Sequence, residues 1–121
     1  MASGDIEDLT RAVVKFRDER NWAQFHNPKD LAISLSLEAS ELLELVQWKN
    51  GEELSEHLST NKKQVGQELS DILYWTLLIA HELRIDLVEA FAEKMAINEQ
   101  KYPAPKVQGS SRKYTDYPSN L

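Results

Sequence analysis

The sequence contains no cysteine, and its 121 residues include only four prolines and four glycines. Without cysteine the chain has no disulfide, no thiolate nucleophile and no Cys-ligated zinc, so any metal must bind to carboxylates or histidines. Basic residues are also few: 14 Lys and Arg stand against 20 Asp and Glu, a net charge of −6. This balance argues against a broad nucleic-acid-binding surface and against anionic membranes as partners.

Long apolar runs are absent as well. The longest, Ile72 to Ala80, falls far short of the roughly 20 residues that a membrane helix needs. The first residues, MASGDIEDL, lack the basic flank and apolar stretch of a secretion signal. With 41% hydrophobic and 28% charged residues, the composition is that of one globular domain. We therefore expect a soluble, cytoplasmic chain.

Apolar residues recur at helical spacing along most of the sequence, and no segment alternates as a strand would. Asn27-Pro28 predicts a helix start, Asn50-Gly51 a left-handed stop, Ser59 to Asn61 a further cap, and Asp86 with Glu89 a capping box. The four main helices are expected over residues 4–20, 28–49, 62–83 and 87–101, with one or two turns over 52–58. An all-α bundle of four main helices is the fold that this pattern favours.

The C-terminal segment differs from the rest. From Pro103 onward it holds three of the four prolines and shows no periodicity. We expect a helical domain over residues 1–103 and an extended or disordered tail over 104–121.

Two pairs of acids have matching spacing. Glu38 and Glu41 lie three residues apart in the second predicted helix, and Glu68 and Asp71 repeat the spacing in the third. Residues three apart share a helix face, and an antiparallel pairing would bring the two pairs together. Ionised carboxylates about 5 Å apart repel by roughly 3 kcal/mol per pair at an effective dielectric of 20. Such a cluster must bind a cation, become protonated or not form.

Oxygen-only ligands select hard ions such as Mg²⁺ or Mn²⁺, and Mg²⁺ commonly shares its coordination with a substrate phosphate. The acids therefore point toward nucleotide chemistry. The alternative is that they are solvated surface positions, which a single ExxE pair usually is. A di-iron site is disfavoured, because neither His57 nor His81 has an acid three positions before it. Glu44, one turn after Glu41, fits an outer-shell or a surface role.

The order Glu38-x-x-Glu41, 26 intervening residues, Glu68-x-x-Asp71 resembles the EExxE-type metal motif of the MazG-like, all-α nucleoside triphosphate pyrophosphohydrolases. The likeness extends over nearly the whole chain. It is closest to the dCTP pyrophosphatase branch, through the segments RNWAQFHNPKDL, ELLELVQWK, QELSDILYW, KMAINEQKYP and SSRKYTDYP.

This resemblance implies Mg²⁺-dependent hydrolysis of dCTP, or of a 5-modified dCTP, to the monophosphate and pyrophosphate, which would clean the nucleotide pool. The metal ligands and catalytic acids it implies are Glu38, Glu41, Glu68 and Asp71. The implied substrate-binding residues are Trp22, Gln24, Phe25, His26, Trp48, Trp75 and Asn98. Two positions depart from the family: Trp75 stands where a close relative carries Tyr, and Val13 where relatives carry a polar residue.

Members of this family form dimers or dimers of dimers, so the resemblance implies a homotetramer, with a dimer as the second choice. The run from Ile72 to Ala80, apolar almost all round, favours a covering partner. Two alternatives stay open. The same reaction could act on dUTP or another nucleoside triphosphate, or the chain could be a non-enzymatic helical oligomerisation module. From the residues alone, Trp48 and Trp75 fit a core as well as a pocket.

Overall fold

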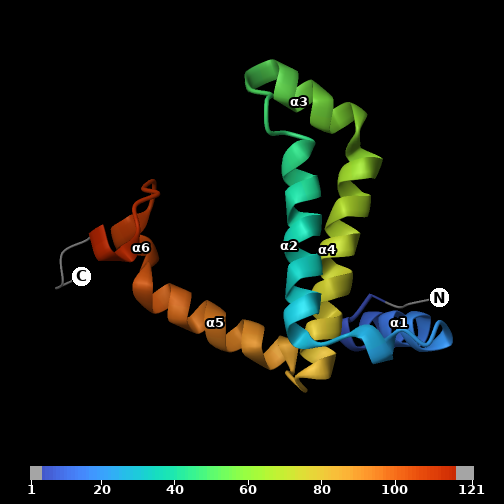
Figure 1. Cartoon of the computed structure of the whole chain (residues 1–121). Helices are drawn as coiled ribbons and strands as arrows, with labels where there is room; N and C mark the ends of the chain where they lie inside the picture. Colours follow the sequence, from blue (N-terminus) through green and yellow to red (C-terminus); the bar gives the residue numbers. More distant parts are fainter. Residues whose placement is uncertain (1–3, 117–121) are drawn as a thin grey trace. The chain divides into compact units, whose positions relative to one another are not determined.

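The computed structural model describes residues 4–116, and within that range it contains helices and no strand, which confirms the all-α prediction (Figure 1). The chain divides into two compact units, residues 1–85 and 86–121. The first holds α1 (Ile6–Glu19), the 3₁₀ turn η1 (Ala23–Phe25), α2 (Pro28–Glu44), α3 (Gly51–Thr60) and α4 (Lys62–Glu82). The second holds α5 (Leu87–Lys101), α6 (Ala104–Val107) and the 3₁₀ turn η2 (Tyr114–Asp116).

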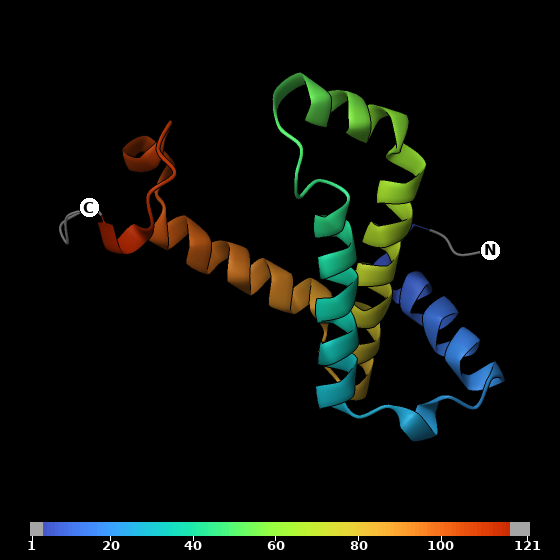
Figure 2. The ribbon, with the colours of Figure 1, turned by 45° about the horizontal axis from the view of Figure 1, so that its top comes forward.

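An antiparallel pair formed by α2 and α4 is the centre of the first unit, and both views show the two helices side by side (Figures 1 and 2). Among the described residues, the largest fully buried side chains are Leu31 on α2 and Leu77 and Leu78 on α4. Burying a leucine completely stabilises a fold by about 1.5–3 kcal/mol. Each of these three leucines is therefore a substantial source of stability for the first unit.

Helix α1 packs against α4. Arg17, 6% exposed, pairs with Glu82 of α4 and with Asp18, whose carboxylate lies 3.0 Å from the guanidinium. The ring of Phe16 meets that of Tyr74 edge to face, with centroids 6.0 Å apart. A buried arginine is tolerated only when it is paired, so these contacts fix where α1 lies on α4.

The second helix ends earlier than predicted, at Glu44 instead of Lys49. After Glu44 the backbone makes i→i+3 hydrogen bonds, from Leu45 to Leu42 and from Val46 to Leu43, which tighten the chain into turns. The apolar pattern continues through these turns, so periodicity could not reveal the change. Gly51 has the predicted left-handed φ of 55°, but it begins α3, which is also longer than expected.

The predicted caps are confirmed at two helix starts. The Asn27 side chain accepts a hydrogen bond from the Asp30 N–H at 2.9 Å, and the Asp86 side chain accepts one from the Glu89 N–H at 3.1 Å. The third predicted cap is wrong in its direction. The Asn61 side chain donates to the carbonyl of His57 at 2.9 Å, so it closes the end of α3 and does not cap α4.

Helix α4 ends in a Schellman motif that has an arginine in the left-handed position. Arg84 has φ 56°, its N–H bonds the His81 carbonyl at 3.2 Å, and the Ile85 N–H bonds the Ala80 carbonyl at 2.8 Å. This position normally carries glycine, because a Cβ makes the left-handed conformation cost about 1–2 kcal/mol.

Replacing Arg84 by glycine is therefore expected to raise the free energy of unfolding by about 1 kcal/mol, since the Cβ penalty is removed. Chemical denaturation with urea measures this change. Arg84→Ala keeps the Cβ and serves as the control, with no comparable gain. A glycine variant no more stable than the alanine variant would show that Arg84 is not strained.

In the second unit, the segment after α5 is held by aromatic contacts. The Tyr114 N–H donates to the Tyr102 hydroxyl at 3.0 Å, and the Lys101 ammonium lies 4.7 Å from the Tyr114 ring centroid. The segment expected to be extended or disordered thus contains α6 and η2, while residues 117–121 lie outside the described range. The boundary at residue 103 stays a prediction.

In residues 4–116 no helix has both the length and the apolar character needed to cross a bilayer.

Candidate functional site

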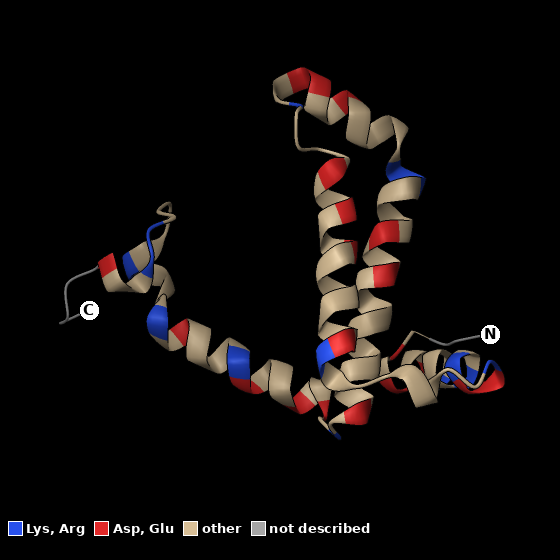
Figure 3. Cartoon of the chain, viewed as in Figure 1, with Lys and Arg blue, Asp and Glu red and all other residues tan. Residues whose placement is uncertain are grey.

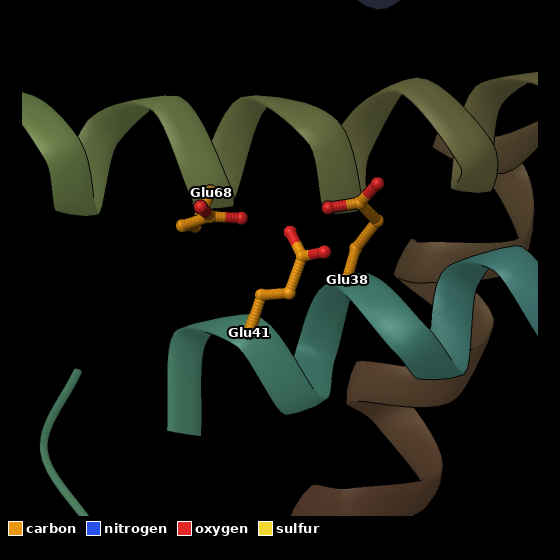
Figure 4. A group of neighbouring side chains, drawn as sticks. All are labelled: Glu38, Glu41 and Glu68. Carbon is orange, nitrogen blue, oxygen red and sulfur yellow. The ribbon is translucent and has the colours of Figure 1, made fainter. Parts of the chain in front are cut away.

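Acidic positions face one another along α2 and α4 (Figure 3). Glu38 and Glu41 on α2 and Glu68 on α4 each offer a carboxylate oxygen, and these oxygens all lie within 4.8 Å of one another (Figure 4). The three-residue spacing puts Glu38 and Glu41 one turn apart on the face of α2 that meets α4. The antiparallel pairing then brings Glu68 to the same point. We call these three residues the acid cluster.

The surroundings of the acid cluster disfavour full ionisation. Burial is the main cause that raises the pKa of Glu38, and the carboxyl group of Glu41 and the charge of Asp71 raise it further, against an opposing effect of Trp75. The pKa of Glu68 is raised by burial and then by the same two acids, Glu41 and Asp71. Asp71 is thus within electrostatic reach of both glutamates, although it is outside the cluster of three.

Two oxygens of the acid cluster are buried and lack a hydrogen-bond partner among the described residues: Oε2 of Glu38 and Oε2 of Glu68. A buried carboxylate oxygen without a donor is costly unless the group is protonated or a cation approaches it. The donor set consists of oxygens alone, which suits a hard divalent ion. The residues present therefore fit a divalent cation.

We expect the metal-free chain to become more stable as the pH falls from 7.5 toward 5. Glu38 and Glu68 have pKa values above their ordinary 4.5, so the folded state favours their protonated forms. Their stabilising contribution is complete below pH 4.5 and is lost as the pH rises through the raised values. Thermal unfolding in EDTA measures the dependence, and Glu38→Gln should flatten it. An unfolding midpoint that decreases steadily as the pH is lowered from 7.5 to 5 would contradict this account.

A pocket of about 450 Å³ adjoins the acid cluster. Glu38 belongs to both, and Asp71 lies on the pocket wall beside it. The remaining wall is apolar and aromatic and comes from α1, α4 and the turn after α1: Ala12, Val13, Phe16, Trp22, Tyr74 and Trp75. A pocket of this size, whose lining combines two acids with several flat rings, can hold a small molecule that has an aromatic part and a cation-binding part.

The aromatic wall is a connected set of edge-to-face contacts. Phe16 meets Trp22 at 5.8 Å and Tyr74 at 6.0 Å between centroids, and Tyr74 meets Trp75 at 4.9 Å. Trp75 in turn meets the ring of His26 at 5.8 Å. Each such pair contributes about 0.5–1.5 kcal/mol beyond the burial of its area. The wall therefore joins α1, α4 and the segment between α1 and α2.

The structure brings some of the predicted substrate-binding residues to the pocket and not others. Trp22 and Trp75 line it, and His26 contacts Trp75. Phe25 and Trp48 do not line it and are 67% and 83% exposed. Gln24 is turned to the backbone, because its amide donates to the Asn21 carbonyl at 3.0 Å. Asn98 belongs to the second unit. The roles of these residues stay predictions.

Sequence reasoning missed three pocket residues, Ala12, Phe16 and Tyr74. Phe16 ends the apolar stripe of the first helix, and Tyr74 lies in the apolar run of the third, so the sequence does not distinguish either from a core residue. Their only sequence signal is the amphipathic pattern of each helix. This pattern indicates that a helix face is buried, but it does not indicate whether other helices or a pocket lie against that face. Val13, noted for its departure from the family, does line the pocket.

The comparisons with known proteins identify the family. Residues 33–117 match the model of the MazG-like family. The chain belongs to the MazG-like family. This MazG-like chain is 43% identical to human dCTP pyrophosphatase 1 over 115 residues, which cover 93% of the chain and 68% of the human protein. It is 40% identical to the bovine dCTP pyrophosphatase 1 over the same shares.

Among solved structures, this MazG-like chain resembles a pyrophosphatase from Archaeoglobus fulgidus DSM 4304. The TM-score is 0.78 at 38% sequence identity, and the match covers 85% of this chain and 96% of the archaeal one. The family membership predicted from the acid spacing and the five segments is therefore confirmed.

Proposed function

We propose that this MazG-like chain is a dCTP pyrophosphatase, a hydrolase that cleaves the anhydride between the α and β phosphates of dCTP and releases dCMP and pyrophosphate. Mammalian relatives about 40% identical over 93% of the chain carry that name. The observation that carries the proposal is the position of Glu38, which belongs both to the acid cluster and to the pocket wall. One nucleotide can then place its base in the pocket and its phosphates at the acids.

The pocket wall suits a pyrimidine ring. Trp22 and Trp75 offer flat apolar surfaces for stacking. Tyr74 offers a hydroxyl, whose pKa burial raises against the lowering effect of Arg17 and Arg20. The hydroxyl is therefore protonated at neutral pH and can donate a hydrogen bond to a base acceptor. A 5-modified dCTP belongs to the same proposal, and dUTP or another nucleoside triphosphate is the second candidate.

The acids would hold Mg²⁺, with Mn²⁺ as a substitute. Glu38, Glu41 and Glu68 are the ligands that the fit favours, and Asp71 at the pocket wall completes the proposed set. When bound, the cation supplies positive charge to the phosphate oxygens at the reacting phosphorus. The aromatic wall offers the base an apolar surface, and Glu38 and Asp71 on the same pocket offer the acids near which the phosphates would bind.

We also propose a cytoplasmic homotetramer, with a dimer as the second choice. The run from Ile72 to Ala80 does not itself require a partner, because Leu77, Leu78 and Ala80 are buried within the chain. The apolar face of helix α5 is the stronger indication of an interface between chains. Its Val88, Phe91 and Met95 lie on one face and are 64%, 69% and 43% exposed. Contiguous exposed apolar side chains of this kind mark interfaces.

A phosphate-release assay coupled to inorganic pyrophosphatase tests the proposal. We expect turnover of dCTP and 5-methyl-dCTP with Mg²⁺ or Mn²⁺, less of dUTP and the purine triphosphates, and none in EDTA. A preference for dUTP would move the assignment to the second candidate. If no nucleotide is hydrolysed and Mg²⁺ does not raise the unfolding midpoint, the chain is instead a non-enzymatic helical module.

A further inference from the structure

Arg20 lies at the end of α1, outside the pocket but against its aromatic wall. Its guanidinium carbon is 3.7 Å from the ring centroid of Phe16 and 6.0 Å from that of Trp22, and both rings line the pocket. An arginine at this distance over an aromatic face is attracted by the ring quadrupole and can lie flat on it. Arg20 itself does not line the pocket.

The same guanidinium is anchored by a hydrogen bond to the residue it covers. Its Nη1 donates to the carbonyl of Phe16 at 2.9 Å. The backbone N–H of Arg20 bonds the Arg17 carbonyl at 3.2 Å instead of the Phe16 carbonyl. The Arg20 side chain therefore supplies a donor to the Phe16 carbonyl in the last turn of α1. Its positive charge is also favoured at the C-terminal end of the helix dipole. Arg20 thus holds both the ring and the backbone of Phe16.

The two rings need this support, because the fold buries them only in part. Phe16 is 41% and Trp22 is 42% exposed. Their mutual contact is edge to face, at 5.8 Å and 72°. Trp22 follows directly on Asn21, whose left-handed φ of 54° ends α1. A half-exposed ring that is packed on one side only can adopt more than one rotamer, unless a neighbouring side chain covers its other side.

We propose that Arg20 is a positioning residue of the nucleotide pocket: stacked on Phe16 and bonded to its carbonyl, it holds Phe16 and Trp22 in the orientation that forms the wall for a flat base. It acts through these rings and does not bind the phosphates. This inference uses the proposed dCTP hydrolysis for its kinetic readout, and a spectroscopic readout tests it without any activity.

The kinetic test separates the base from the phosphates by using two inhibitors of dCTP hydrolysis. Deoxycytidine has no phosphate, and pyrophosphate has no base. In Arg20→Ala and Arg20→Lys the inhibition constant of deoxycytidine and the KM for dCTP are expected to rise about fivefold, an effect of the size of one exposed cation–π contact. The inhibition constant of pyrophosphate and kcat should stay within about twofold.

Lysine is informative because it keeps the charge but cannot lie flat on a ring or reproduce the fixed fork of donors. If Arg20 instead binds phosphate, Arg20→Lys should have the inhibition constants and KM of the native chain, or the inhibition constant of pyrophosphate should rise as much as that of deoxycytidine. Either result overturns the proposal. Arg11→Ala is the matched control on the same helix. Arg11 pairs with Glu7 and Asp8 and has no recorded contact with an aromatic ring of the described chain.

Near-ultraviolet circular dichroism supplies the readout that needs no turnover. We expect the aromatic bands to weaken in Arg20→Ala and Arg20→Lys and to be unchanged in Arg11→Ala. Bands unchanged in both Arg20 variants overturn the proposal. If the native chain hydrolyses no nucleotide, the proposed function fails, but the spectra still decide whether Arg20 orders the wall.

Discussion

Replacing Glu38 by glutamine is expected to lower Mg²⁺-dependent dCTP hydrolysis at least about 100-fold, a loss that removal of an outer-shell partner of a metal can already cause. Glu38 is the residue shared by the acid cluster and the pocket, so the substitution weakens the proposed cation site where the substrate must meet it. Steady-state turnover at saturating dCTP and increasing Mg²⁺ measures the loss. The variant should fold, because glutamine has the same shape and relieves repulsion.

Glu44→Gln is the control for this experiment. Glu44 is exposed at the end of α2 and is outside the acid cluster, so its neutralisation should change turnover less than about twofold. In EDTA the Glu38 variant should unfold at the native temperature or above it, and Mg²⁺ should raise its midpoint less than that of the native chain. Native turnover in Glu38→Gln would remove this residue from the catalytic site.

Replacing Phe91 by aspartate is expected to break the assembly into smaller species. Phe91 is 69% exposed on the apolar face that α5 shares with Val88 and Met95, so the substitution costs the isolated chain little. Burying a phenylalanine at an interface stabilises it by about 1.5–3 kcal/mol, and burying an unpaired carboxylate there costs more. In a symmetric interface the change occurs twice, which weakens association by more than about 100-fold.

Light scattering coupled to size-exclusion chromatography measures the masses. The native chain should elute with the mass of four chains, and Phe91→Asp with the mass of two or one. Gln100→Asp adds the same charge to the same helix at an exposed position on the opposite side and should leave the mass unchanged. A native mass of one chain would contradict the tetramer and the dimer alike.

Local signals account for the parts of the fold that could be predicted. Asn27 and Asp86 cap the helices that follow them, since a cap depends on a side chain and an amide only three residues away. The end of α2 was predicted five residues too late, because the apolar pattern persists where the hydrogen bonds shift to i→i+3. Asn61 was assigned to the wrong helix, because an amide side chain can donate backward as well as accept forward.

The candidate site divides in the same way. Glu38 and Glu41 could be paired from their spacing, and the likeness to the MazG-like family supplied the roles. Their approach to Glu68, within 4.8 Å, and the position of Asp71 on the pocket wall depend on how α2 and α4 pair. Trp48, which the resemblance implied for the pocket, is instead exposed in the turn after α2 within this chain. Contacts between separate elements depend on packing, and spacing alone does not specify them.

The sequence by itself determined the all-α class, the two acid pairs and most helix starts, because each depends on residue types at intervals of three to seven along one helix. It also determined the family, through the order of the acid pairs and of the five matching segments along the chain. Only the tertiary structure decided that Phe16, Tyr74 and Val13 form a pocket wall, that Glu38 is shared between that wall and the acids, and that Arg20 covers Phe16. The physical reason is that the sequence pattern of an amphipathic helix shows which of its faces is apolar, while side-chain packing between α1, α2 and α4 determines which residues that face contacts.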